Sequence, residues 1–445
     1  MGVPGFFRWL VNRYPLTRQN MHDPSQPRFN NLYIDMNGIL YKAAEITHIK
    51  ENRLTPDFAA EMCRYLDMLV QFCRPTDTLF IAVDGCAPSA KNLQQRSRRF
   101  KSGHDMHPGS FDRCNFTAGT PFMNDINNYL LKFIKEKKQN DSAWRTPKVV
   151  YSSSFVPGEG EHKILDWIRS CRHQSNWKPN MTHILYSTDA DLIFLTLRTH
   201  EPYFSILREA DSSAYQKPKE KFEYSETKMK WDADAFEILN INLVREYLSV
   251  DFNVKGEELE KTIDDFVAIS FLVGNDFIPE FSDIVIQKGS FNTIINCFKE
   301  VRTKRNNEHL IINGDFNKSF LKELFTKIVS ELENVYNEQN EKNPEKISYE
   351  QYNRNYILSK YPDQKDNYDA LIKDMAFNIF NAFYWVLQYY ESGCPSWIWS
   401  YRYHYSPPLQ LVIPFIDQYE PHFELGTPTR PLLQQLFVLP PQSAD

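Results

Sequence analysis

Between residues 31 and 210 the chain alternates short runs of β-branched and aromatic residues with longer stretches whose apolar residues recur every three or four positions. The short runs, which we expect to form buried strands, are Leu32–Asp35, Thr78–Asp84, Val149–Ser153 and His183–Ser187. The periodic stretches, which we expect to form amphipathic helices, are Asp57–Cys73, Pro121–Lys138 and Glu161–Arg172. Strands that alternate with helices indicate βαβ units. The pattern therefore predicts an α/β fold with a mainly parallel central sheet flanked by helices.

Two later stretches break this pattern, because residues 210–235 and 300–350 are polar and carry runs of charge. We expect insertions or linkers there. The last hundred residues are denser in aromatic residues and proline, which indicates a helical second module packed on the first. The predicted division is a core over residues 1–300, a polar insertion or linker over 301–350 and an aromatic-rich module over 351–445.

The amino-acid composition excludes several classes of protein. Of the 445 residues, 42% are hydrophobic and 24% charged, which is typical of a globular protein and excludes collagen-like and disordered classes. The seven cysteines are odd in number and never spaced C-x-x-C, so we expect neither a zinc ribbon nor a disulfide framework, and a reducing compartment fits best. No uncharged apolar run reaches the ~18 residues of a membrane span. The net charge of −6 argues against a general coat on nucleic acid, so any such binding must be local.

Carboxylates mark the points where the predicted strands end. Two acids close strands, two D/E-x-D/E pairs follow later strands, and one lies in the segment Gly274-Asn-Asp-Phe. The set comprises Asp35, Asp84, Glu159, Glu161, Asp189, Asp191 and Asp276. Singly, acids at helix starts are well explained as caps. Gathered at one sheet edge they would repel one another unless cations lay among them. Mg²⁺ or Mn²⁺ suits such oxygen ligands, and two ions ~4 Å apart assist phosphodiester hydrolysis.

A basic segment follows the strand that ends in Asp84. It reads KNLQQRSRRFKSG over residues 91–103 and contains no acid. An exposed basic helix face is the common explanation of such a run. Because arginine suits bidentate phosphate recognition and lysine a point-charge contact, a phosphate pocket that positions a nucleic-acid end for cutting is the functional alternative.

These segments carry a family resemblance. The opening MGVPGFFRWLVNRYP, then IDMNGILY, VDGCAPSAKNLQQRSRRFKS, VPGEGEHKI, STDADLI, LRE and GNDFIP resemble, in order, the motifs of the Xrn family of 5′→3′ exoribonucleases. The tail segments WVLQYYESGCPSWIWSYRYHYSP and FELGTPTRPLLQQLFVLPPQS resemble the start of that family's second conserved region. The resemblance implies a nuclease core related to PIN domains and flap endonucleases. It also implies Mg²⁺- or Mn²⁺-dependent degradation of single-stranded RNA bearing a 5′-monophosphate to mononucleotides, by two-metal-ion catalysis.

Residue by residue, the resemblance makes the seven acids above the catalytic metal ligands. The family's 5′-phosphate pocket matches at Lys91, Gln95, Arg98 and Arg99. The aromatic pair that sandwiches the first bases in the family would use Tyr41, where relatives usually have histidine, with either Trp397 or Trp399 as its partner. Ser89 replaces a basic residue of many relatives.

The chain ends where longer relatives continue, so it is either a short natural member or has a truncated second region. We expect a monomer that acts in RNA or messenger-RNA degradation, inside the cell and in the cytoplasm rather than the nucleus. A viral form acting in the host cytoplasm would also fit. The alternatives are a flap-type structure-specific DNA endonuclease, disfavoured by the free-phosphate pocket, and a catalytically dead RNA-binding scaffold, disfavoured because no acid is lost.

Overall fold

The computed structural model describes residues 5–20, 29–104, 110–187, 189–210 and 236–443. The chain forms two compact units, each assembled from separated segments. The sheet unit comprises Leu10–Cys86, Gly103–Tyr247 and Gln442–Asp445. The helical unit comprises Met1–Trp9, Ala87–Ser102 and Leu248–Pro441. The predicted division at residues 300 and 350 stays a prediction, and the two units do not follow it.

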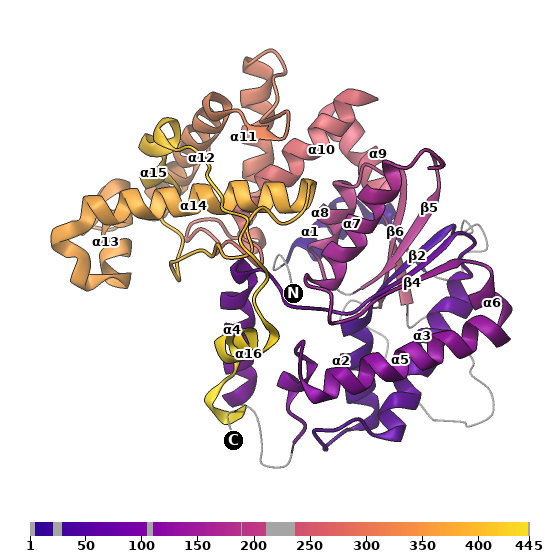
Figure 1. The fold of residues 1–445 in the computed structure, drawn as a ribbon. Coiled ribbons are helices and arrows are strands. Elements are labelled where there is room, and N and C mark those ends of the chain that lie inside the picture. The colour runs from indigo at the N-terminus through magenta and orange to yellow at the C-terminus, as the bar shows by residue number, and fades with distance from the viewer. Residues whose placement is uncertain (1–4, 21–28, 105–109, 188, 211–235, 444–445) are drawn as a thin grey trace. The chain divides into compact units, whose positions relative to one another are not determined.

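A seven-stranded sheet forms the centre of the sheet unit (Figure 1), in the order β1-β7-β6-β5-β2-β3-β4. Its strands are β1 (Arg18–Asn20), β2 (Asn31–Asp35), β3 (Thr78–Ala82), β4 (Lys148–Ser152), β5 (Thr182–Tyr186), β6 (Tyr203–Glu209) and β7 (Phe236–Asn240). The five strands from β4 to β6 in this order pair in parallel, whereas β7 pairs antiparallel with both β6 and β1. The α/β fold with a mainly parallel sheet is therefore confirmed.

The helices of the sheet unit connect these parallel strands. They are α2 (Met36–Thr47), α3 (Pro56–Cys73), α5 (Pro121–Asn140), α6 (Ser142–Arg145), α7 (Gly160–Arg172) and α8 (Leu192–Leu197). Two of them begin alike: Thr55 and Thr120 each accept a hydrogen bond from the backbone N–H three residues later, and a proline follows as the first helical residue. A threonine cap and a proline at the first position both favour helix initiation. The three helices predicted from apolar spacing correspond to α3, α5 and α7.

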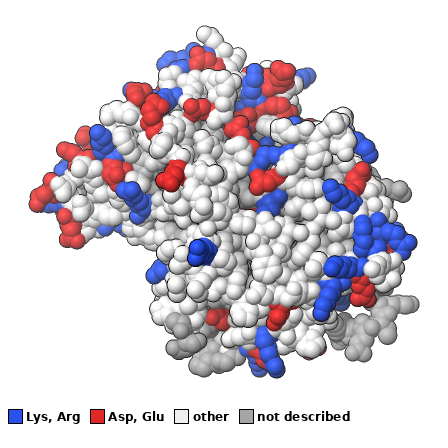
Figure 2. All heavy atoms as spheres, viewed as in Figure 1, with Lys and Arg blue, Asp and Glu red and all other residues white. Residues whose placement is uncertain are grey.

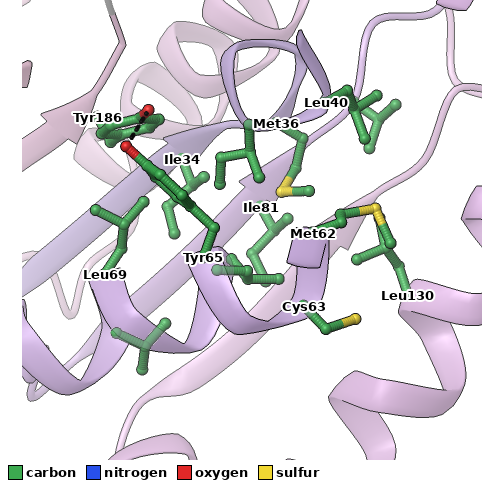
Figure 3. Close-up of a cluster of buried hydrophobic side chains, with 14 of the residues drawn as sticks. Ile34, Met36, Leu40, Met62, Cys63, Tyr65, Leu69, Ile81, Leu130 and Tyr186 are labelled. Carbon is green, nitrogen blue, oxygen red and sulfur yellow. Dashed lines mark hydrogen bonds between the residues drawn. The ribbon is translucent and has the colours of Figure 1, made fainter. Parts of the chain in front are cut away.

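The core of the sheet unit fills the space between the sheet and the helices α2, α3 and α5. Figure 3 shows Ile34 and Ile81 from neighbouring strands facing Met62 and Leu69 of α3, all with little or no solvent exposure. The polar ends of the aromatic side chains are satisfied within this core, because the Tyr186 hydroxyl donates to that of Tyr65 over 3.2 Å. A rigid apolar layer thus fixes the strands whose ends carry the acids.

The helical unit contains α4 (Ser89–His104), α10 (Glu257–Ser270), α11 (Ser290–Lys304), α12 (Lys318–Gln339), α13 (Tyr349–Lys360), α14 (Tyr368–Glu391), α15 (Leu409–Val412) and α16 (Pro431–Val438), and a short hairpin of β8 (Ile311–Ile312) and β9 (Asp315–Phe316). Among the described elements, three helices contain a boundary between the units: α1 (Phe6–Arg13), α9 (Ile241–Phe252) and α4, whose last two residues belong to the sheet unit. Aromatic clusters line α14, whose Trp385 is fully buried, so the helical, aromatic-rich C-terminal region is confirmed.

The segment expected to be a polar insertion or linker, residues 301–350, differs from the expectation. It contains the β8–β9 hairpin and the 22-residue helix α12. The inner face of α12 buries Phe320, Leu324 and Ile328 at four-residue spacing, and this apolar stripe holds the helix against the unit despite its charged outer face. The other polar stretch, residues 210–235, falls almost wholly outside the described residues.

Candidate metal centre

The carboxyl ends of the parallel strands form one edge of the sheet. From β2 the chain passes to β3 and β4 on one side, whereas β5 and β6 lie on the other side of β2. In open α/β sheets ligands bind at such a switch point, beyond the strand ends. Asp35 ends β2, and Asp189 and Asp191 follow β5. Asp84 follows β3 and Glu159 follows β4, so four neighbouring strands deliver acids to this edge.

Two groups of side chains have ligand atoms close enough to hold a cation. Oxygens of Glu161, Asp189 and Asp191 lie within 4.8 Å of one another, and a second group joins Glu159 and Glu161 to His162. Glu161 belongs to both groups, and all five side chains are buried or partly buried. Carboxylate oxygens in this number are the ligands that Mg²⁺ and Mn²⁺ prefer. The residues present therefore fit a hard divalent cation.

Asp35 and Asp84 are tied together by Asn37. The Asn37 amide group donates from Nδ2 to Oδ2 of Asp84 over 2.6 Å, and its backbone N–H donates to Oδ1 of Asp35 over 3.2 Å. The first residue of α7 adds a third contact, because the Gly160 N–H donates to Oδ1 of Asp84 over 2.6 Å. A side chain on Gly160 would place its Cβ 3.0 Å from Oδ1 of Asp35 and 3.3 Å from Oδ1 of Asp84. A larger residue at position 160 would therefore require both carboxylates to shift by a few tenths of an ångström.

The carboxylates at this edge of the sheet lie close enough to affect one another's pKa values. Burial and the neighbouring carboxylates Asp84 and Asp189 raise the pKa of Asp35 well above its usual value, although hydrogen bonds from Asn37 and Ser187 oppose the shift. A bound cation would favour the ionised form and reverse this shift. An ammonium close to Asp84 belongs to Lys163, whose pKa is lowered to about 8, mainly by burial.

Lys163 joins two strand ends. Its Nζ donates to the carbonyl oxygen of Val83, 2.7 Å away, and to that of Ser153, 3.0 Å away. It thereby links the chain after β3, directly before Asp84, to the chain after β4.

Sequence reasoning missed Asn37, Lys163 and Ser187 as site residues. Each lies within two residues of an acid that had been identified, and this proximity was the available signal.

Asp276 belongs to the helical unit, whereas the other six acids belong to the sheet unit. Its Oδ2 lies 2.5 Å from Nζ of Lys91, and its Oδ1 accepts from Gln94 over 3.1 Å. Two residues expected in different roles, a metal ligand and a phosphate ligand, are therefore paired with each other. The assignment of Asp276 to the metal centre stays a prediction.

The basic segment forms helix α4 of the helical unit. Gln95 is half-buried and its Oε1 accepts from Gln434 of α16, 3.2 Å away, and Arg96 donates to the Phe437 carbonyl oxygen at the end of α16 over 2.8 Å. The two helices lie side by side (Figure 1). Of the four residues of the predicted pocket, Arg98 is exposed, Gln95 and Arg99 are half-buried and Lys91 is buried.

The three candidate stacking residues differ in their surroundings. Tyr41, in the sheet unit, is 39% exposed and meets Phe116 edge to face at 5.0 Å. In the helical unit, the Trp399 ring stacks on buried Trp385 at 5.7 Å. Trp397 is held through its backbone: its N–H donates to Leu425 over 2.7 Å, and its carbonyl accepts from Ser89, the first residue of α4. Among the described residues, the Trp397 ring makes no aromatic contact. Trp397 is thus the freer of the two indoles.

On the face shown in Figure 2, positive and negative side chains are interspersed over most of the surface rather than gathered into one basic field. In the described part of the chain, every helix is too short or too polar to cross a lipid bilayer.

Known proteins and family models are similar to this chain over nearly its whole length. A family model described as XRN 5′-3′ exonuclease N-terminus matches residues 1–210, and another, described as Xrn1 helical domain, matches residues 257–356 and 346–445. The chain is 29% identical to 5′-3′ exoribonuclease 1 of Schizosaccharomyces pombe over 598 residues, which cover 100% of this chain and 44% of that protein. It is 30% identical to the human 5′-3′ exoribonuclease 1 over 533 residues, covering 100% of this chain and 31% of that protein. The chain thus spans less than half the length of these relatives.

Among solved structures, the catalytic core of Rad2 in complex with a DNA substrate matches 74% of this chain and 80% of that chain. The sequence identity is 13% and the TM-score 0.37, a value too low to bear on the fold.

Proposed function

Since the chain belongs to the XRN family of 5′-3′ exonucleases, we propose that it hydrolyses single-stranded RNA from a 5′-monophosphate end, releasing mononucleotides. The observation that carries the proposal is the convergence of Glu161, Asp189 and Asp191 within 4.8 Å at the switch point of a parallel sheet. The reaction belongs to the degradation of RNA, including messenger RNA. We place it in the cytoplasm and assign it to a monomer as parts of the same proposal.

Two Mg²⁺ or Mn²⁺ ions, when bound, would supply an activated water and stabilise the leaving oxygen. The ligands we assign to them are the six predicted acids of the sheet unit, and the role of Asp276, in the helical unit, stays a prediction. The protein's own contribution is rigidity. Asn37 fixes the carboxylates of Asp35 and Asp84, Gly160 leaves room for both, and Lys163 holds the chain beyond β3 and β4. Preorganised ligands need no rearrangement when the substrate arrives.

The 5′ end is recognised, in this proposal, by the basic helix α4. A terminal phosphate carries about one more negative charge than an internal diester, and paired guanidinium groups bind it through charge-assisted hydrogen bonds. Arg98 is exposed and Arg99 half-buried, whereas Lys91 is buried beside Asp276. We therefore assign direct phosphate contact to the two arginines, with Lys91 and Gln95 completing the pocket.

Bases are held by stacking, which tolerates any sequence as a degradative enzyme requires. Tyr41 offers an exposed ring in the sheet unit. In the helical unit we assign the stacking role to Trp397 rather than Trp399, because the Trp399 ring is stacked on Trp385.

The experiment is degradation of one RNA sequence prepared with 5′-monophosphate, 5′-hydroxyl or 5′-triphosphate ends, with Mg²⁺ or with EDTA. We expect mononucleotides from the monophosphate form and only with the metal ion. A DNA flap substrate of the same sequence tests the alternative that the protein is a flap endonuclease. Cleavage of the flap without degradation of the RNA, or RNA binding without hydrolysis, would overturn the proposal.

A further inference from the structure

The loop that connects β4 to α7 carries an exposed apolar tip beside the candidate metal centre. Phe155, Val156 and Pro157 are exposed between buried Ser154 and buried Gly158. The Phe155 side chain is 66% exposed, although most phenylalanines of the protein are buried. Single exposed apolar residues are common on protein surfaces and need no explanation. Phe155 differs from such residues because the backbone of its loop is held by hydrogen bonds and because the loop leads to Glu159.

The loop is braced at both ends. The Gly85 N–H donates to the Gly158 carbonyl over 2.9 Å, and the Gly158 N–H donates to the Cys86 carbonyl over 2.8 Å. Before the tip, the Ser154 hydroxyl accepts from buried Asn127 of α5 over 2.5 Å, and the Ser153 carbonyl accepts from Lys163. The exposed tip therefore stands on a backbone fixed by bonds to three other segments.

The packing under the tip is close. A Cβ on Gly85 would lie 1.9 Å from the Val156 carbonyl oxygen, so the backbone of the loop rests directly on that of residue 85. A loop packed this tightly loses little conformational freedom when a ligand meets it, which favours binding by an exposed side chain.

The tip lies at the catalytic edge. It follows the carboxyl end of β4, and Glu159, a member of one carboxylate group, comes four positions after Phe155. Four extended residues span at most about 14 Å, which places Phe155 within a few nucleotides of a strand bound at that group. A phenyl ring offers a flat apolar face on which any base stacks.

We propose that Phe155 is a positioning residue that stacks on a base of the RNA strand next to the carboxylate cluster. This rests on the proposed function, because it requires RNA to be the substrate. The structure assigns the residue by three observations together: its exposure, its braced backbone and its place on the loop that leads to Glu159.

The test compares Phe155→Ala, Phe155→Leu and Phe155→Trp with wild type on 5′-monophosphorylated single-stranded RNA. The matched control is Tyr203→Ala, since Tyr203 is a similarly exposed aromatic residue, 49% exposed, at the amino end of β6 and thus at the opposite edge of the same sheet. Kinetics give kcat and KM separately. In a second readout, 2-aminopurine is placed at each of the first five positions of the RNA, and its fluorescence is measured on an Asp191→Asn background that stops hydrolysis.

We expect Phe155→Ala to lower kcat/KM about 5- to 150-fold, mainly through KM, the scale of one base–aromatic stack. Phe155→Trp should keep the wild-type value and Phe155→Leu should not. At one 2-aminopurine position the quenching should depend on the aromatic ring, and the melting temperature and the Tyr203→Ala activity should stay unchanged. If wild type degrades RNA and Phe155→Ala matches it in KM and in quenching, this inference alone is overturned. A wild-type protein inactive on RNA would overturn the proposed function and this inference with it.

Discussion

Lys91 and Asp276 form a buried ion pair, in which Nζ of Lys91 lies 2.5 Å from Oδ2 of Asp276 and the two side chains are 7% and 6% exposed. The residues are 185 positions apart in the chain, and the pair joins the basic helix α4 to the segment after α10. It links one residue expected to bind phosphate with another expected to bind metal.

Removing either partner leaves a buried charge without its counter-ion, which costs about 3–5 kcal/mol. We expect Lys91→Met and Asp276→Leu each to destabilise the helical unit on this scale. The double variant should lose much less than the sum, because it leaves neither charge behind. Urea denaturation without metal measures the four states, with Lys101→Met, an exposed lysine on the same helix, as the control. Additive losses would show that the pair is not coupled.

Asp189→Asn or Asp191→Asn should abolish hydrolysis, because each change removes a proposed metal ligand. Without metal the folded state should be as stable as wild type or more stable, since carboxylate repulsion falls. RNA degradation and thermal melting with and without Mg²⁺ provide the two readouts. Asp166→Asn, on the exposed face of α7, is the matched control. Near-wild-type turnover in either site variant would remove that residue from the metal centre.

Gly160→Ala tests the geometry of the site with a single methyl group. Its Cβ would come within 3.0 Å of Asp35 and 3.3 Å of Asp84, whose carboxylates must then move by a few tenths of an ångström or more. Misplacement of catalytic groups by about 1 Å costs on the order of 10²-fold in rate, so for this smaller displacement we expect a clear loss of activity below that size. Gly38→Ala, where the nearest atom is 3.7 Å away on Tyr186, should keep its activity. Equal activities of the two variants would contradict the assigned positions.

His309 makes the stability of the helical unit depend on pH. Its Nδ1 lies 2.7 Å from Asp265 and its Nε2 3.0 Å from Glu258, so both ring nitrogens face carboxylates. Arg302 contacts the same oxygen of Glu258. The hydrogen bond to Asp265 raises the pKa of His309 above its usual 6.5, and burial raises the pKa of Asp265. Both shifts favour the protonated forms in the folded state.

A raised histidine pKa contributes stability that is full below the unfolded-state pKa of ~6.5 and is lost as the pH rises through the folded-state pKa. We therefore expect the difference in melting temperature between wild type and His309→Gln to be largest near pH 5.5 and to shrink above neutrality. Thermal melts from pH 5.5 to 9 measure it. A difference that stays constant or grows with pH would mean that the imidazolium contributes nothing.

Strands β2, β3, β4 and β5 and the acids at or after their ends could be predicted because a short-range rule governs each, whereas β1, β6 and β7 were not predicted. Buried apolar runs of four to seven residues mark strands such as β2 and β3, and parallel pairing brings their carboxyl ends to one edge. Helix α12 was not predicted, although Phe320, Leu324 and Ile328 form its apolar stripe. The many charged residues between them obscured the helical spacing. The bond between Lys91 and Asp276 could not be predicted, since nothing local relates two residues on distant segments.

The central claim, that hydrolysis starts from a 5′-phosphate, is tested most directly by Arg99→Ala, alone and with Arg98→Ala, on RNA of one sequence with a 5′-monophosphate or a 5′-hydroxyl. Losing a hydrogen bond to a charged group costs about 1.5–3 kcal/mol, or about ten- to a hundredfold in kcat/KM. We predict that this loss falls on the monophosphate substrate and barely affects the hydroxyl substrate, so the preference between the two ends collapses. An equal loss on both substrates would show that the arginines bind the RNA backbone generally and would contradict the account.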